Sequence, residues 1–175
     1  MYMMNPVHIE LNSKTAVPQR YVPKHLTQKD KTKQKRQLLK SRKLYKRGVY
    51  HSRPAVNSFV SRKSSHLNKL KTIYNVNNAF PTPELAKKTK CKLDALKQII
   101  HKGEGAYFSS GSRPNQSAQS WGIARLASSL TGGNASVIDY HILAEGCKPQ
   151  SKALKLAKKQ CKKLNRNCTT RKNRK

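Results

Sequence analysis

The sequence predicts an all-α protein with a small helical core, an extended N-terminal arm and basic tails. Apolar residues recur at helical spacing in several segments, and residues that begin or end helices stand at the limits of these segments. Apolar residues form only 35% of the 175 residues, so the core should be small. The net charge is +31, so the chain needs a polyanion or an acidic partner to be compact.

Residues 1–23 are expected to form the extended arm, which could lie along a partner surface. Pro6, Pro18 and Pro23 interrupt this segment, and each disfavours helix in the residue before it. The segment begins without a basic region or a long apolar run, so no signal peptide is expected. No run of about 18 apolar residues occurs, so no membrane-spanning helix is expected either.

Residues 24–66 are expected to hold a strongly basic helix and a linker. The first 24 of these residues include eleven cations and one acid. Thr27 with Asp30 resembles a capping box and Gly48 is a stop signal, which predicts a helix over 28–46. Its apolar residues lie in the second half, so the first half should become ordered against a partner. A solvated charged helix is the alternative, although like charges four residues apart destabilise an isolated helix.

Residues 67–147 are expected to form the small helical core, because apolar residues recur there at helical spacing. Glycines mark two of the expected breaks, at Gly103–Gly105 and Gly132–Gly133. Helices are expected over 67–76, as a pair within 83–101, from a Ser117 or Ser120 cap to about Leu130, and over 135–146. The side chains expected in the core are Leu85, Leu93, Leu96, Ile100, Tyr107, Trp121, Leu126, Leu130, Ile138 and Ile142.

The pair of helices within 83–101 follows the phase of a helix-turn-helix. Thr82 can cap the first helix, Pro83 suits its first position, and a turn is expected at residues 90–92. The pattern departs from the usual one at Lys90, where such a turn favours glycine. Three roles stay open, namely packing alone, DNA contact without sequence preference, and sequence readout. The side chains available for readout are Lys92, Lys97, Gln98 and His101.

Residues 148–175 are expected to form a basic amphipathic helix and a tail. They hold twelve cations and no acid. In a helix over 151–165, an apolar stripe from Ala153 to Leu164 should dock on the core, which leaves the lysine face free to meet anions.

The side chains expected to contact an anion, nucleic acid or a protein partner lie on the two basic helices and on the helix pair. Phosphate contact by so many cations would depend strongly on salt, because each neutralised phosphate releases counterions. The expected contacts are Lys31, Lys33, Lys35, Arg36, Lys40, Arg42, Lys43, Lys46, Arg47, Lys92, Lys97, Lys155, Lys158, Lys159, Lys162 and Lys163.

No arrangement of side chains predicts catalysis, a metal site, a cofactor or a small-molecule substrate. The acids are isolated, and neither a nucleophile elbow nor a phosphate-binding lysine motif occurs. The four cysteines form no CxxC pair and are expected to be reduced, packed thiols. If Cys161 and Cys168 share one helix, they lie about 10 Å apart along its axis, too far for a disulfide.

Residues 107–122 form a nearly uncharged segment in this basic chain. They hold a single charge, Arg113, and the single Trp of the sequence, Trp121. The aromatic rings of the segment should be buried in the core. Arg113 has few competing cations nearby, so it is expected to pair with a carboxylate or a helix C-terminus.

Three strings of the sequence carry a resemblance to a known family. They are RYVPKHLTQKDKTKQKRQLLKSRKLYKRGVY (Arg20–Tyr50), ELAKKTKCKLDALKQIIHKGEGAYFSSGSRPNQSAQSWGIARLASSLTGG (Glu84–Gly133) and IDYHILAEGC (Ile138–Cys147). The strings resemble an uncharacterised family, with a domain of unknown function, of large icosahedral double-stranded DNA viruses of algae and amoebae. The resemblance supplies no catalytic residue, and it implies a protein of a large icosahedral virus with a double-stranded DNA genome.

These observations together predict a non-enzymatic minor capsid protein on the inner side of the capsid. Such a protein would cement neighbouring capsid proteins of the icosahedral assembly and contact an anionic partner, either viral DNA or the inner-membrane surface. The alternative is a DNA-binding protein that condenses the viral genome or uses residues 84–101 as a helix-turn-helix.

Overall fold

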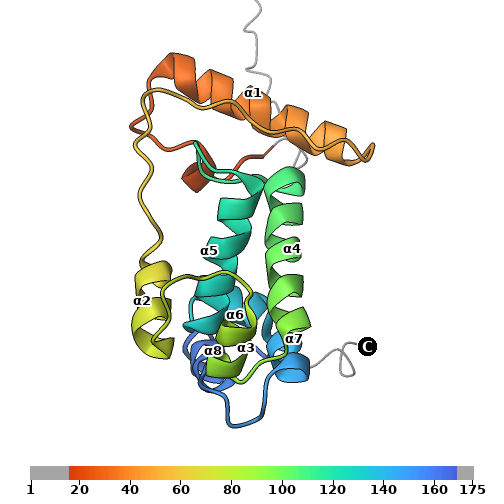
Figure 1. Ribbon diagram of the computed structural model, residues 1–175. Coiled ribbons are helices and arrows are strands. Elements are labelled where there is room, and N and C mark those ends of the chain that lie inside the picture. The colour runs from red at the N-terminus through yellow and green to blue at the C-terminus, as the bar shows by residue number, and fades with distance from the viewer. Residues whose placement is uncertain (1–15, 169–175) are drawn as a thin grey trace, which may run out of the picture.

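A computed structural model describes residues 16–168, and in that range the all-α class is confirmed (Figure 1). The predicted arm residues 1–15 and tail residues 169–175 lie outside the described range. A short 3-10 helix, η2 (Gln19–Tyr21), precedes the α-helices. These are α1 (Gln28–Tyr45), α2 (Ser65–Tyr74), α3 (Pro83–Thr89), α4 (Leu93–Ser109), α5 (Ala118–Leu130), α6 (Asn134–Ile138), α7 (Tyr140–Gly146) and α8 (Lys152–Lys163).

The long helices α4 and α5 run side by side in opposite directions and form the centre of the molecule (Figure 1). Helix α1 lies across one end of this pair, and α2, α3, α6, α7 and α8 gather around the other end. At about 1.5 Å per residue, the 17 residues of α4 separate the two ends by roughly 25 Å. The fold therefore has a narrow middle and two distinct ends.

The hydrophobic core lies at the end that holds the shorter helices. Leu96 and Ile99 of α4, Leu126 and Leu130 of α5, and Leu143 of α7 are fully buried in it. Burying one such side chain stabilises the fold by about 1.5 to 3 kcal/mol. Helix α8 contributes Ala153, Leu154 and Ala157 to the same cluster.

The expected core residues divide into three groups in the structure. Leu93 and Trp121 are half-buried. Ile138 is 54% exposed, so the prediction for it was wrong, because the helix ends there and the chain turns at the next residue. The buried members are Leu85, Leu96, Ile100, Tyr107, Leu126, Leu130 and Ile142.

The turn expected at Gly103–Gly105 does not exist, because α4 continues through both glycines to Ser109. Gly103 instead allows α4 and α5 to approach closely. A Cβ atom on Gly103 would lie 2.6 Å from the Cα atom of Gly122 in α5, and one on Gly122 would lie 2.9 Å from the carbonyl oxygen of Ile100. Gly103 and Gly122 therefore allow close packing of the two helices, and Gly103 does not reverse the chain.

The single helix expected over 135–146 is broken at Asp139 into α6 and α7. The Asp139 carboxylate is fully buried and accepts hydrogen bonds from Arg125 Nε (2.8 Å) and Nη2 (2.7 Å) and from Ser129 Oγ (2.9 Å). Lys102 Nζ lies 3.0 Å from the same carboxylate. Burial alone would raise the pKa of Asp139, but the hydrogen bonds and charges of Arg125 and Lys102 outweigh it and hold the pKa below its ordinary value.

The described end of the predicted arm is packed against the body instead of extended. Tyr21, at the end of η2, is buried, and its ring meets Trp121 edge to face with 6.0 Å between the centroids. Its carbonyl oxygen accepts a hydrogen bond from the buried Gln34 amide (3.1 Å). An aromatic contact and a satisfied polar group therefore order this segment, which the proline spacing alone did not predict.

Candidate anion-binding surfaces

Helix α1 is attached to the molecule through a buried stripe that is mostly polar. The stripe consists of Asp30, Gln34, Leu38 and Ser41, spaced three or four residues apart along one face. Asp30 accepts hydrogen bonds from the Ser58 N–H (2.8 Å) and hydroxyl (2.6 Å), which hold the pKa of this carboxyl below its ordinary value. The first half of the helix therefore has residues to bury within the chain itself, which the expectation missed because it considered apolar residues alone.

Arg53, in the loop after α1, joins three parts of the chain beneath this helix. Its guanidinium donates to Ser41 Oγ (3.1 Å), the Tyr107 carbonyl oxygen (2.8 Å) and Ser112 Oγ (2.7 Å). Its central carbon lies 3.6 Å from the centroid of the Tyr107 ring, which adds a cation–π contact. Burial lowers the pKa of Arg53 from its ordinary value, and the nearby hydroxyls and carbonyl oxygen compensate the buried charge.

The structural role expected of Arg113 belongs to Arg53. The Arg113 side chain is exposed. The loop between α4 and α5 is held by Asn115, whose side chain donates to the carbonyl oxygens of Val56 (3.0 Å) and Phe59 (2.9 Å) and accepts from the Val56 N–H (2.8 Å). The prediction failed because the partners of the loop, Val56 and Phe59, lie 59 and 56 positions earlier in the chain.

Replacing Arg53 with lysine should lower the free energy of unfolding by about 1 to 3 kcal/mol. Lysine keeps the charge but cannot make the forked set of hydrogen bonds, and this leaves buried polar groups without partners. Denaturant unfolding measures the change, with Arg113→Lys as the matched control that should cost less than about 0.5 kcal/mol. Equal losses in the two variants would contradict the role assigned to Arg53.

The outward face of α1 and the turn that follows it carry a row of exposed cations, here called the α1 surface: Lys35, Arg36, Lys40, Lys43, Lys46 and Arg47. Three other expected contacts on this helix, Lys31, Lys33 and Arg42, are half-buried. Lys33 Nζ donates to the Ala55 carbonyl oxygen (2.7 Å), and Arg42 donates to the Ser110 carbonyl oxygen (2.8 Å). Lys33 and Arg42 therefore fasten α1 to the fold and are less available to a partner.

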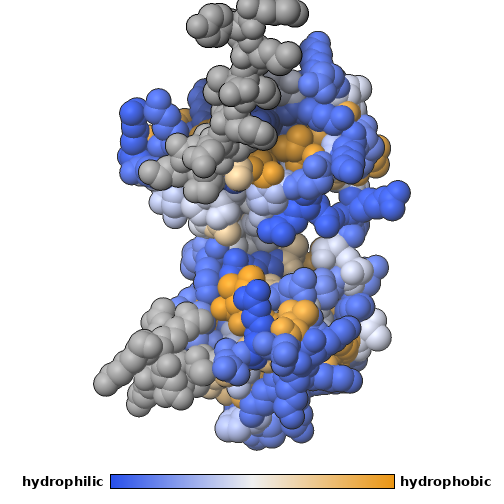
Figure 2. All heavy atoms as spheres, turned by 180° about the vertical axis from the view of Figure 1, so that it is seen from behind, coloured by the Kyte–Doolittle hydropathy of each residue, from blue (hydrophilic) through white to orange (hydrophobic). Residues whose placement is uncertain are grey.

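Helix α8 presents a second cationic face at the other end of the molecule. Its residues Ala153, Leu154, Ala157 and Cys161 are buried, whereas Leu164, expected at the end of this stripe, is 42% exposed because the helix ends at Lys163. The opposite side, here called the α8 surface, consists of the exposed Lys155, Lys158, Lys159, Lys162 and Lys163. Figure 2 shows that hydrophilic residues cover most of both ends of the molecule on the face seen from behind.

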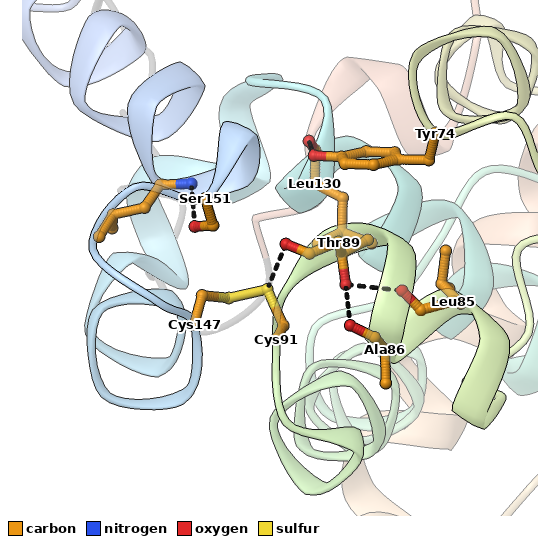
Figure 3. The surroundings of a disulfide bond; sticks show 9 residues. Tyr74, Leu85, Ala86, Thr89, Cys91, Leu130, Cys147 and Ser151 are labelled. Carbon is orange, nitrogen blue, oxygen red and sulfur yellow. Dashed lines mark hydrogen bonds between the residues drawn. A yellow bond between two sulfur atoms is a disulfide. The ribbon is translucent and has the colours of Figure 1, made fainter.

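The turn of the helix-turn-helix-like pair is fixed to the segment between α7 and α8. Lys90 ends α3 in the left-handed conformation (φ 57°), which glycine would adopt more readily. The Lys92 N–H donates to the Gly146 carbonyl oxygen (2.7 Å), and the Lys148 N–H donates to that of Lys90 (2.9 Å). The disulfide between Cys91 and Cys147, drawn in Figure 3, joins the two residues that lie between these hydrogen bonds.

The expectation of reduced thiols was wrong for both cysteine pairs. Cys161 and Cys168 also form a disulfide, because α8 ends before Cys168 and the chain turns back at Asn165 (φ 53°). The premise that the two cysteines share one helix therefore failed. Lysines flank both cysteines of the first pair, in Lys90-Cys91-Lys92 and Cys147-Lys148, so this disulfide brings three cations to one corner.

The side chains considered for base readout are exposed on α4. Lys97 and Gln98 lie there with Asp94, an acid that would meet DNA unfavourably on the same helix. His101 Nδ1 lies 3.2 Å from a carboxylate oxygen of Glu104. The cations that the structure gathers are therefore at the turn and on α1 and α8, rather than along the outward side of α4.

Within residues 16–168, no three His, Cys, Asp or Glu side chains gather where they could hold a metal ion. None of the helices in the described part of the chain has the length and apolar character needed to cross a bilayer.

The fold and its surfaces define an all-helical protein with lysine-rich faces at two opposite ends. The chain belongs to the Family of unknown function (DUF5824), whose model matches residues 18–142. This range includes α1 and the α4–α5 pair and ends before α8. Neither a curated protein nor a solved structure matches the chain.

Proposed function

We propose that the chain is a non-enzymatic structural protein of a virus particle that joins two anionic surfaces through its two ends. The observation that carries the proposal is the placement of the α1 surface and the α8 surface at opposite ends of the α4–α5 pair. A protein that binds one polyanion along a single face would not need cations at both ends. The viral setting comes from the resemblance of the sequence strings, and the minor capsid role is one form of this bridging.

The electrostatics of the described residues support the same proposal. Asp30 and Asp139 are buried and compensated inside the fold, so neither carboxylate weakens the cationic exterior. Surfaces of a single sign attract polyanions from a distance, with an attraction that salt weakens.

A bead assay tests the bridging proposal. One duplex DNA is fixed to beads, a second labelled duplex is in solution, and recovered label measures bridging by the full chain. Two variants each replace four cations with glutamine, one on α1 (Lys35, Arg36, Lys40, Lys43) and one on α8 (Lys155, Lys158, Lys159, Lys162). Each variant should still bind the bead DNA but lose most of the bridging, because one end remains cationic and the other does not.

The two variants remove equal charge, so they control for each other. If either variant bridges like the unaltered protein, the end that it alters is not a contact surface and the proposal fails. Replacing the labelled duplex with phosphatidylserine vesicles distinguishes the two forms of the proposal. Recovery of vesicles on DNA beads supports a position between membrane and genome, whereas recovery of DNA alone supports the alternative of genome condensation.

A further inference from the structure

Two hollows lie side by side on the surface at the corner where the α3–α4 turn meets the segment between α7 and α8. Their volumes are about 460 Å³ and 230 Å³, and Lys90 lines both of them. Glu145 is the single acid among the lining residues. The lysines that line one or both hollows are Lys87, Lys88, Lys90, Lys92, Lys148 and Lys152.

The backbone beneath these lysines is held in place from two sides. The disulfide between Cys91 and Cys147, which Figure 3 shows, joins the turn to the neighbouring segment. The two backbone hydrogen bonds of Lys92 and Lys148 join the same two segments. Like charges in a flexible loop would separate, but here the chain cannot move them apart by shifting its backbone. The cations are therefore gathered before any ligand arrives, which reduces the cost of ordering them on binding.

We propose that this lysine corner binds consecutive phosphates of a nucleic-acid backbone. This inference rests on the proposed function and assigns a third contact, distinct from the α1 and α8 surfaces. A phosphodiester backbone is a ridge with regularly spaced charges, and such a ridge fits a concave row of two adjacent hollows. A membrane surface is broad and would meet the rims of the hollows rather than the lysines lining them. Contacts to phosphates position a protein without reading bases, so the binding is independent of sequence.

The test measures how the affinity of the full chain for a mixed-sequence 30-base-pair duplex changes with NaCl concentration. One variant combines Lys87→Gln, Lys92→Gln and Lys148→Gln, which removes three cations from the larger hollow. The control combines Lys63→Gln, Lys69→Gln and Lys71→Gln, which removes three exposed cations elsewhere. Circular dichroism and thermal unfolding check that both variants keep the fold.

The corner variant should reduce the magnitude of the slope of log affinity against log salt concentration by about 2 to 3. Each lost phosphate contact lowers the magnitude of this slope by about 0.9. The control should change it by less than about 1. Equal slopes in the two variants would overturn the assignment while leaving the bridging result unaffected, since bridging is tested on α1 and α8. A corner variant that loses binding to phosphatidylserine vesicles but keeps the duplex slope would also overturn it, in favour of a lipid headgroup.

Discussion

Replacing Arg125 with methionine should lower the free energy of unfolding by about 3 to 5 kcal/mol. Arg125 donates two hydrogen bonds to the fully buried carboxylate of Asp139, and methionine fills much of the space without replacing them. The carboxylate would then lie in the interior with Lys102 and Ser129 as its remaining partners. Denaturant unfolding of the variant and the unaltered protein measures the loss.

Lys102→Met is the matched control for this prediction. The Lys102 side chain is 37% exposed, and its removal leaves the two hydrogen bonds from Arg125 to Asp139 in place. We expect it to cost about 1 kcal/mol, in keeping with a partly exposed ion pair. A Lys102 variant that is as unstable as the Arg125 variant would show that the carboxylate does not depend mainly on arginine.

The same carboxylate should make stability depend on acid. The pKa of Asp139 in the folded protein lies below its ordinary value of 3.8, so the unfolded chain takes up the proton first as the pH falls. Its contribution to stability is complete above the ordinary value and is lost as the pH falls through the folded pKa. Asp139→Asn should flatten this part of a stability profile measured between pH 6 and pH 2.

Removing the disulfide between Cys91 and Cys147 by a double serine substitution should cost about 4 kcal/mol. The two cysteines are 56 residues apart, and the bond restricts the unfolded chain by closing that long loop. Both cysteines are also buried, so the serine hydroxyls would add a cost of their own. Urea unfolding without a reducing agent measures the difference. When both proteins are unfolded with a reducing agent, which also opens the bond between Cys161 and Cys168, most of the difference between them should disappear.

The second disulfide provides the comparison. Cys161 and Cys168 are seven residues apart, so the same loop-closure argument gives about 2.5 kcal/mol for their double serine variant. The loop lies at the edge of the described chain and its loss should leave the core intact. If the Cys161 and Cys168 variant proves the less stable of the two, loop length does not govern the contribution of these bonds.

Local signals in the sequence predicted α3 and the start of α4 well, but not the continuation of α4 to Ser109. At the start of α3 the Thr82 hydroxyl oxygen accepts a hydrogen bond from the Leu85 N–H, and Pro83 follows it. At its end Lys90 occupies the turn position that glycine usually takes. The apolar stripe of α8 was equally visible, because its residues recur at helical spacing over three turns. Caps and periodicity act between residues that are close in sequence, so one sequence suffices to see them.

The features that escaped prediction depend on partners far along the chain. Asp30 is buried because of Ser58, and the turn between α4 and α5 depends on contacts with Val56. Neither contact has a periodic sequence signal. Asp139 interrupts a helix that its neighbours would otherwise continue, because its carboxylate is held by Arg125 and Lys102. The expectation for α1 considered apolar residues alone, so the buried polar stripe that attaches this helix was missed.

The lysine corner was missed for a related reason. The sequence shows cations beside Cys91 and beside Cys147, but they are separated by more than fifty residues, and the cysteines were expected to be unpaired. The disulfide brings the two clusters together. A basic residue on each side of a cysteine is common in so basic a chain, so the pattern carries little information before the pairing is known.

The close contact of Gly103 with Gly122 has a mechanical consequence. Backbones that touch without intervening side chains cannot slide or bend independently, so α4 and α5 should act as one stiff strut. A stiff strut transmits a load applied at α1 to α8 instead of absorbing it by bending. Two surfaces joined by this protein would consequently be held at a fixed spacing, set by the length of α4 and independent of how strongly either surface is bound.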